Sequence, residues 1–160
     1  FSLMDEEYQL KAQLNIIGDG SNLDNIKKLS NKNPHIVFHG RQNVTNMPKF
    51  FKASDFLIIS LLDKPLFSAT VPGKTQTYIA AKKPIIAIIN GETADIIIDN
   101  NLGLHADPSD IGMISNVFQQ CVEMPTNKKE EFIVNSQKLL DTTFNKKLIV
   151  KQFVQSILEL

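Results

Sequence analysis

The sequence has no tryptophan, a single cysteine and no excess of either charge, with 17 basic and 17 acidic side chains among 160 residues. This balance of charge gives no indication of nucleic-acid binding. Cys121 has no partner for an internal disulfide, which fits a reducing compartment, and its apolar helical surroundings predict core packing. The longest apolar runs are too short to cross a bilayer. These absences leave an ordinary globular protein, with 42% hydrophobic residues and enough length for one domain.

The amino-terminal residues lack both a start methionine and the pattern of a signal peptide. The stretch "FSLMDEEYQLKAQ" (1–13) is typical of the second half of a helix. We therefore expect a fragment of a longer protein that begins after an opening strand. Part of any binding site would then lie outside the chain.

Apolar segments of strand length alternate with helical patterns along the chain. Ser21, with Asp24 three residues later, predicts one helix start through a capping box, and Pro72 predicts the first helical position of another. The alternation predicts a doubly wound, Rossmann-like parallel sheet with helices on both faces. The expected strands are 12–18, 35–40, 55–60, 83–90 and 102–107. Ligands of such sheets bind outside the carboxyl ends of the strands, which here means the loops 18–21, 40–45, 61–73 and 90–93.

The stretch "SATVPGKT" (68–75) differs from the nucleoside-triphosphate P-loop pattern by a serine in place of the first glycine. That serine brings a Cβ to a position where the backbone must wrap around phosphate, and Pro72 removes an N–H group that such a loop uses. The neighbouring strands end in serine and asparagine rather than in a magnesium-binding aspartate. The sequence therefore does not predict an ATP or GTP site.

A different anion site is still compatible with this loop. The small residues Ser68, Ala69 and Thr70 lead into a helix whose first turn carries Gly73 and Lys74. A helix N-terminus presents free N–H groups and a partial positive charge, to which the lysine adds a full charge. The pattern favours a phosphate or diphosphate, and a plain helix start with a solvated lysine is the alternative.

Three blocks of sequence follow one another in a familiar order: "LNIIGDGSNLDNIKKL" (14–29), "HIVFHGRQNVTNMPKFFKASDFLIIS" (35–60) and "VPGKTQTYIAAKKPIIAIINGETADIIIDNNLGLHADPSD" (71–110). Together they resemble the C-terminal, donor-binding domain of a GT-B retaining glycosyltransferase of the kind that builds bacterial capsule and O-antigen polysaccharides. The stretch "PGKTQTY" (72–78) is similar to one in transferases of N-acetylated deoxy-amino sugars such as fucosamine. The resemblance implies a nucleotide-sugar-binding domain over 1–144, followed by a helix over 145–160 that packs toward an N-terminal domain.

The resemblance also implies site residues where its motifs match this sequence. The first glycine turn would lie near the donor diphosphate, and the second loop would flank the nucleotide base. The helix start would contact phosphate, the lysine would lie beside the diphosphate or sugar, and the last loop would form the rim of the cleft. The residues so implied are Gly18, Asp19, Gly20, Gly40, Arg41, Gln42, Thr70, Val71, Gly73, Lys74, Gly91, Glu92 and Thr93.

The sequence departs from the family where many members carry two glutamates, one facing the donor sugar and one holding the ribose. The corresponding positions are Ala69 and Thr77, and neither is acidic. Thr77 can still hydrogen-bond a hydroxyl, so we include it among the donor-binding residues. We do not expect the usual carboxylate clamp on the ribose.

The resemblance implies the donor-binding part of a bacterial glycosyltransferase, cytoplasmic and, at full length, at the inner face of the cell membrane. Its partners would be a UDP-sugar, the N-terminal domain of the same protein and a lipid-linked or saccharide acceptor, without nucleic acid, metal or cofactor. We expect the isolated fragment to be inactive, because the acceptor site lies in the other domain. The alternatives are a UDP-sugar 2-epimerase-like domain, whose donor-site carboxylates are not found here, and a non-catalytic Rossmann-like binding module.

Several side chains that could carry chemistry have a simpler interpretation. The histidines show no metal-ligand spacing, and the two phenylalanines of the helix near residue 50 have no basic residues interleaved with them in a nucleic-acid-binding pattern. We expect structural or surface roles for His35, His39, His105, Phe50 and Phe51.

The departures from the P-loop pattern predict that the protein does not hydrolyse nucleoside triphosphates. Phosphate release from ATP or GTP in the presence of magnesium should stay at the background rate for the wild type and for Lys74→Ala. A magnesium-dependent activity that disappears in Lys74→Ala would show that the loop is a P-loop after all.

Overall fold

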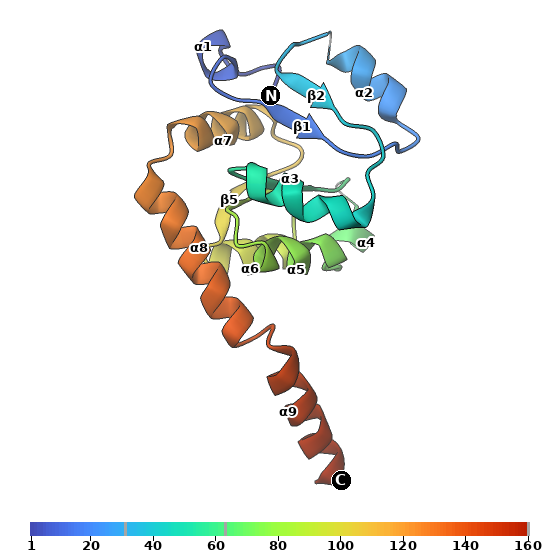
Figure 1. The fold of residues 1–160 in the computed structure, drawn as a ribbon, viewed down its shortest axis with the longest axis vertical. Helices are drawn as coiled ribbons and strands as arrows, with labels where there is room; N and C mark the ends of the chain where they lie inside the picture. The colour runs from blue at the N-terminus through green and yellow to red at the C-terminus, as the bar shows by residue number, and fades with distance from the viewer. Residues whose placement is uncertain (31, 63, 160) are drawn as a thin grey trace.

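The computed structural model describes residues 1–30, 32–62 and 64–159. In this part of the chain, short strands form two parallel sheets (Figure 1). In the smaller sheet, β1 (Leu14–Ile16) pairs with β2 (Ile36–Phe38). In the larger sheet, β4 (Ile85–Ile88) lies between β3 (Leu57–Ser60) and β5 (Gly103–Ala106).

The predicted alternation of strands and helices and the parallel pairing are confirmed, but the single continuous sheet is not. The orders β1-β2 and β3-β4-β5 are compatible with the common doubly wound order 3-2-1-4-5-6 if β1 and β2 correspond to its strands 2 and 3, and β3, β4 and β5 to its strands 4, 5 and 6. In that order, strand 1 lies between strands 2 and 4, which here are β1 and β3. None of the described residues forms a strand that corresponds to strand 1. The two sheets therefore stay separate.

The predicted helices are present, with four differences. The helix expected at the amino terminus is confirmed only over α1. The N-cap of α2 is Asn22 and makes no side-chain cap hydrogen bond, so the capping box at Ser21 is wrong. Pro72 is the N-cap residue of α5 and not its first helical residue, and the short helix α4 was not predicted. The helices are α1 (Glu6–Gln9), α2 (Leu23–Leu29), the 3-10 turn η1 (Val44–Asn46), α3 (Met47–Ala53), α4 (Pro65–Ser68), α5 (Gly73–Ala80), α6 (Glu92–Asp99), α7 (Ile111–Glu123), α8 (Thr126–Asp141) and α9 (Lys146–Leu158).

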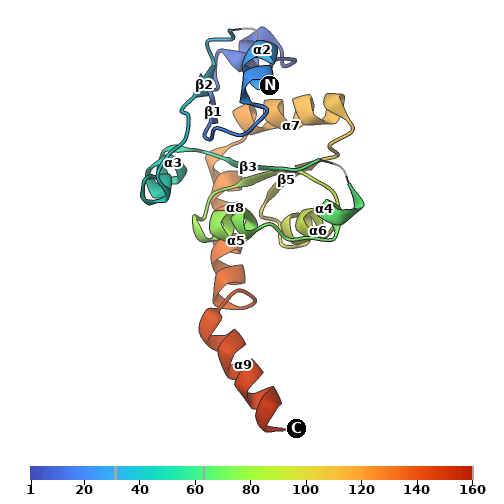
Figure 2. The ribbon, with the colours of Figure 1, turned by 90° about the vertical axis from the view of Figure 1, so that its right-hand side faces the viewer.

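Helices cover both faces of the larger sheet, as predicted (Figure 2). Side chains alternate between the two faces of a strand. Ile85 and Ala87 of β4 accordingly pack in a cluster with residues of α5, α6 and α8, whereas Ile86 packs in a second cluster with Val117 and Cys121 of α7. Because β4 is buried on both faces, its near-continuous apolar sequence is the one expected for a central parallel strand.

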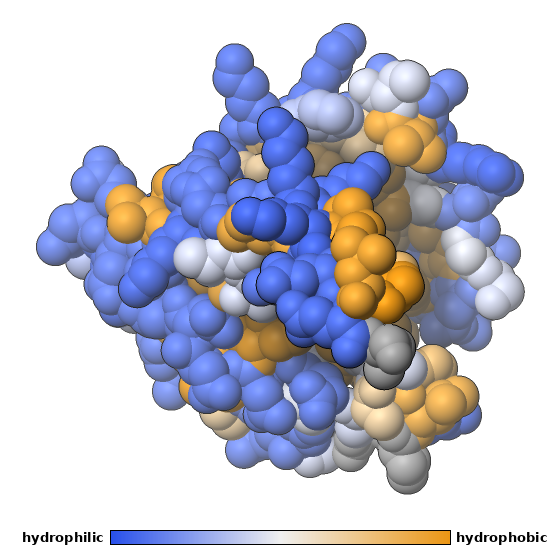
Figure 3. Space-filling model, turned by 90° about the horizontal axis from the view of Figure 1, so that it is seen from below, coloured by the Kyte–Doolittle hydropathy of each residue, from blue (hydrophilic) through white to orange (hydrophobic). Residues whose placement is uncertain are grey.

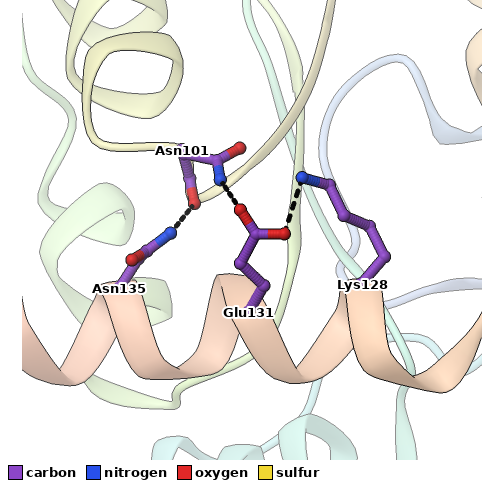
Figure 4. A network of polar contacts seen from close by, with 4 residues as sticks. All are labelled: Asn101, Lys128, Glu131 and Asn135. Carbon is purple, nitrogen blue, oxygen red and sulfur yellow. Dashed lines mark hydrogen bonds and ion pairs between the residues drawn. The ribbon is translucent and has the colours of Figure 1, made fainter.

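A polar network fixes α8 to the turn between α6 and β5 (Figure 4). Asn135 donates a hydrogen bond to the carbonyl of Asn101 at 2.9 Å, and the Asn101 side chain donates to the Glu131 carboxylate. Lys128 lies 2.9 Å from the second oxygen of that carboxylate. The network joins side chains one turn apart on α8, so it fixes the orientation of the helix as well as its position.

The last helix, α9, extends away from both sheets (Figures 1 and 2). Its apolar side chains are between 44% and 81% exposed, and Figure 3 shows apolar surface gathered at this end of the molecule. A cavity of about 400 Å³ lies where α9 meets α5 and the end of α8. Among the described residues, no helix combines the length and the apolar character needed to cross a membrane.

Burial of the single cysteine gives a prediction for stability at alkaline pH. Cys121 is 7% exposed, and desolvation raises the pKa of its thiol to about 12, against a smaller opposing effect of Lys129. An unfolded cysteine ionises near about pH 8.5. The stabilisation from the neutral thiol is therefore complete below that pH and is lost as the pH rises toward 12, at up to about 1.4 kcal/mol per pH unit.

The free energy of unfolding of the wild type should consequently fall more steeply between pH 8 and 10 than that of Cys121→Ala. Subtracting the two profiles removes the titration of lysines and tyrosines, which is common to both proteins. Equal slopes would show that the thiol is not desolvated in solution.

Candidate functional site

The predicted site residues lie after the carboxyl ends of four strands and form two groups. The first group follows β1 and β2. Gly18 donates a backbone hydrogen bond to the carbonyl of Gly40 at 2.8 Å, so the two glycine turns are directly joined. The Arg41 guanidinium lies 3.9 Å from the Asp19 carboxylate, with both side chains exposed. Gln42 donates to the carbonyl of His39 at 2.8 Å, and the exposed Gly20 accepts a backbone hydrogen bond from Leu23 at 2.9 Å.

The first group therefore offers mainly backbone groups and one exposed charge pair to a ligand. An exposed pair at 3.9 Å contributes little to stability, because solvent screens it. The Arg41 side chain can leave Asp19 for a ligand at low cost. This fits the predicted role of the second loop beside a nucleotide base.

The second group surrounds the start of α5. Thr70, Val71, Gly73 and Lys74 are exposed, and the N-cap residue Pro72 supplies no side-chain hydrogen bond to the first turn. Among the described residues, the N–H groups of Gly73 and Lys74 have no hydrogen-bond acceptor, and the Lys74 ammonium has no ion pair. These two amides and the lysine can therefore receive an anion from solvent.

Thr77 occupies one of the positions where the family usually has a glutamate. Its hydroxyl donates to the carbonyl of Gly73, four residues earlier, at 3.1 Å. The hydroxyl is exposed, and its oxygen can still accept a hydrogen bond from a ligand while its hydrogen stays bonded to the Gly73 carbonyl. Ala69, the other position, is also exposed and carries no polar group.

Gly91, Glu92 and Thr93 belong to the same group, because the start of α6 contacts the loop before α5. The Thr93 hydroxyl donates to the carbonyl of Thr70 at 3.2 Å. Gly91 has φ +81°, and a Cβ added there would lie 2.1 Å from the carbonyl oxygen of Ser68. Only glycine allows this approach of the two backbones, which explains a glycine at position 91.

Hydrogen bonds unite each group, and within the described residues none joins the first group to the second. A cavity of about 370 Å³ lies at the opposite end of β2, lined in part by Glu6, Lys32 and His35. The structure thus places the predicted residues at the expected edges of the two sheets, in two separate groups rather than around one closed pocket.

The histidines have ordinary partners. The ring of His39 is hydrogen-bonded to the Asn15 side chain at 2.7 Å and packs edge-on against Phe50, with the ring centroids 5.1 Å apart. His105 bonds the carbonyl of Ile89 at 3.0 Å. In the described ranges, no group of three or more His, Cys, Asp or Glu side chains has the geometry of a metal site.

Thr75, which the sequence did not single out, is a buried threonine on α5 directly after Lys74. It is fully buried, and its Oγ1 has no hydrogen-bond partner in the described structure. Thr93 is equally buried but donates its bond to the loop. A threonine at a helical core position four residues before a buried isoleucine is the only sequence signal that could have indicated Thr75.

A family profile described as "Glycosyl transferases group 1" matches residues 1–139, most of the chain. The chain belongs to the group 1 glycosyl transferases. This assignment confirms the glycosyltransferase resemblance and favours a transferase over the epimerase-like and non-catalytic alternatives. The likeness to fucosamine transferases and the C-terminal position within a whole enzyme stay predictions.

Individual proteins similar to this group 1 glycosyl transferase are themselves described as glycosyltransferases or were solved with UDP bound. Probable glycosyltransferase WbjE of Pseudomonas aeruginosa is 27% identical over 118 residues, which cover 71% of this chain and 29% of WbjE. The crystal structure of Anabaena Alr3699/HepE in complex with UDP aligns with all of this chain and 46% of HepE, with a TM-score of 0.72 and 17% identity.

WaaG, a glycosyltransferase involved in lipopolysaccharide biosynthesis, aligns with 85% of this chain and 38% of its own, with a TM-score of 0.66 and 16% identity. The structural likeness confirms the predicted α/β fold, which matches one half of these GT-B enzymes. The chain spans less than half the length of each of the three relatives.

The two buried threonines predict opposite effects of the same substitution. Thr75→Val replaces a buried hydroxyl without a partner by a methyl group and should raise the free energy of unfolding by about 1–3 kcal/mol. Thr93→Val removes a hydrogen bond that is made and should lower it by about 0.5–1.5 kcal/mol. Denaturant unfolding of both variants measures this, and a loss of stability in Thr75→Val would show that its hydroxyl has a partner in solution.

Proposed function

We propose that this group 1 glycosyl transferase holds a UDP-sugar, with the diphosphate at the start of α5. The observation that carries the proposal is the pair of free N–H groups at Gly73 and Lys74, beside an ammonium that has no ion pair among the described residues. Oriented amides, the positive end of a helix dipole and a full positive charge all favour a diphosphate. UDP bound to the structurally similar HepE supports the choice of nucleotide.

The first group of residues would hold the rest of the nucleotide. The backbone at Gly40 and the exposed Arg41 side chain would flank the base, while the turn at Gly18, Asp19 and Gly20 would lie near the diphosphate. Thr77 would accept a hydrogen bond from a ribose hydroxyl, since its own hydrogen is donated to the Gly73 carbonyl, and this neutral bond would be weaker than the usual carboxylate clamp. Glu92 would lie at the rim of the site.

In the whole enzyme, this half would bind the leaving group of the reaction. Negative charge accumulates on the diphosphate as the bond between the sugar and UDP breaks, and preorganised amides and Lys74 stabilise that charge. Because the amides and Lys74 supply positive charge, we propose that the reaction uses no metal ion and no cofactor, with the UDP-sugar as the donor substrate.

The wider biological role is part of the same proposal. A retaining transferase for bacterial capsule or O-antigen synthesis, using a donor such as N-acetyl-fucosamine, fits the sequence resemblance, and the structurally similar WaaG is involved in lipopolysaccharide biosynthesis. The acceptor, lipid-linked or saccharide, would bind an N-terminal domain at the inner face of the membrane. The exposed apolar side of α9 would pack toward that domain, and residues 1–159 alone would not transfer sugar.

Calorimetric titration with UDP and with uridine tests the diphosphate site. UDP should bind the wild type more tightly than uridine. Lys74→Ala should lower the affinity for UDP by roughly ten- to hundredfold, because a charge-assisted hydrogen bond contributes about 1.5–3 kcal/mol. The affinity for uridine should not change.

Lys138→Ala is the matched control, because Lys138 is an exposed lysine in the last turn of α8 and is not among the predicted site residues. Its affinity for UDP should equal that of the wild type. If uridine binds the wild type as well as UDP does, or if both lysine variants behave alike, the diphosphate does not bind at α5.

A further inference from the structure

The loop that leads into α5 is held at its far end by another helix. The Thr70 hydroxyl donates to the carbonyls of two preceding residues, Leu66 at 3.2 Å and Phe67 at 3.0 Å. The Thr70 N–H also donates to the Phe67 carbonyl. These contacts connect Thr70 to α4. None of them fixes the loop relative to the sheet.

The loop is connected to the sheet through α6, by two contacts that are two residues apart on each segment. The backbone of Gly91 packs against the carbonyl of Ser68, so closely that there is no room for a Cβ. Two residues later, the Thr93 hydroxyl donates to the carbonyl of Thr70. Thr93 is fully buried and lies shortly after β4, so it has little freedom to move. The loop between Ser68 and Thr70 thus lies against the start of α6 at both ends.

The next residues are those whose amides face the solvent. Pro72 has no N–H group and makes no side-chain cap. Within α5, the N–H of Thr75 donates to the Pro72 carbonyl at 2.8 Å, so the chain entering the helix is held from the helix side by a backbone bond. The packing of α5, through its buried Thr75 and Ile79, sets the axis along which the Gly73 and Lys74 amides point, and the placement of Thr70 sets how the loop approaches them. Within the described residues, the hydroxyl of Thr93 supplies the side-chain hydrogen bond that places it from outside the loop.

We propose that Thr93 is a positioning residue for the donor diphosphate, acting through its hydrogen bond to the Thr70 carbonyl and not through contact with the ligand. This inference rests on the proposed diphosphate site at α5. It assigns to the start of α6 a role different from the rim contact implied by the family resemblance. Without the bond, the loop and the first amides of α5 would sample several orientations, and phosphate would bind more weakly.

The test is titration of UDP and uridine into the wild type, Thr93→Val and Thr93→Ser. The valine keeps the shape but cannot donate, so UDP affinity should fall about three- to tenfold, the ratio that corresponds to one lost neutral hydrogen bond. Uridine affinity should not change. Serine keeps the hydroxyl and should restore most of the UDP affinity.

Thr75→Val is the matched control, since it is the same substitution at an equally buried threonine whose hydroxyl bonds nothing in the described structure. It should bind UDP like the wild type. The amide NMR signals of the folded protein give a second measurement, because a loss of overall stability alone would not change their chemical shifts. The Gly73 and Lys74 signals should shift and broaden in Thr93→Val and return in Thr93→Ser. Thr93→Ala takes the place of the valine variant if that protein does not fold.

The outcomes separate this inference from the proposed function. Wild type that fails to bind UDP overturns the proposed function, and the donor role of Thr93 with it. Wild type that binds UDP, with Thr93→Val showing the same affinity and unchanged Gly73 and Lys74 signals, overturns the inference alone. A loss that serine does not restore would also overturn it, since the hydroxyl would then not be the cause.

Discussion

The arrangement of the candidate site depends on β4, which is buried on both faces and pairs with β3 on one side and β5 on the other. Parallel pairing places Ser60 opposite Ile88, so the segments after β3 and β4 leave the sheet at the same edge. The loop before α5 and the start of α6 must therefore meet. The contacts between Gly91 and Ser68 and between Thr93 and Thr70 are a consequence of this pairing.

Local sequence pattern was sufficient to predict most of the elements and the edge of the sheet where the site lies. Strand and helix types came from apolar periodicity, and the carboxyl-end loops from the parallel topology that this alternation requires. The local sequence pattern could not show that β1 and β2 form a sheet separate from that of β3. The apolar pattern of a strand does not identify the strand with which it pairs. It also missed α4, a single helical turn of four residues within a stretch that has the composition of a loop.

Side-chain partners were the least predictable part of the site. Ser21 and Asp24 have the spacing of a capping box, yet the N-cap lies one residue later at Asn22, without a side-chain cap. Thr75 and Thr93 have the same side chain and the same full burial, but within the described part of the chain only Thr93 has a hydrogen-bond acceptor. That difference depends on a carbonyl 23 residues away in the chain, and no local pattern contains it.

The structure also shows how the backbone of Ser-Ala-Thr-Val-Pro-Gly-Lys-Thr differs from the wrapped backbone of a P-loop. A P-loop wraps its backbone around phosphate, starting from a glycine that tolerates unusual dihedral angles. Here that position is Ser68, the last residue of α4, and its carbonyl is packed against Gly91. The backbone of this loop is committed to α6 and cannot close around a ligand. The proposed diphosphate would lie across two amides and a lysine on the open side of the α5 start, an arrangement that needs no loop closed around the ligand.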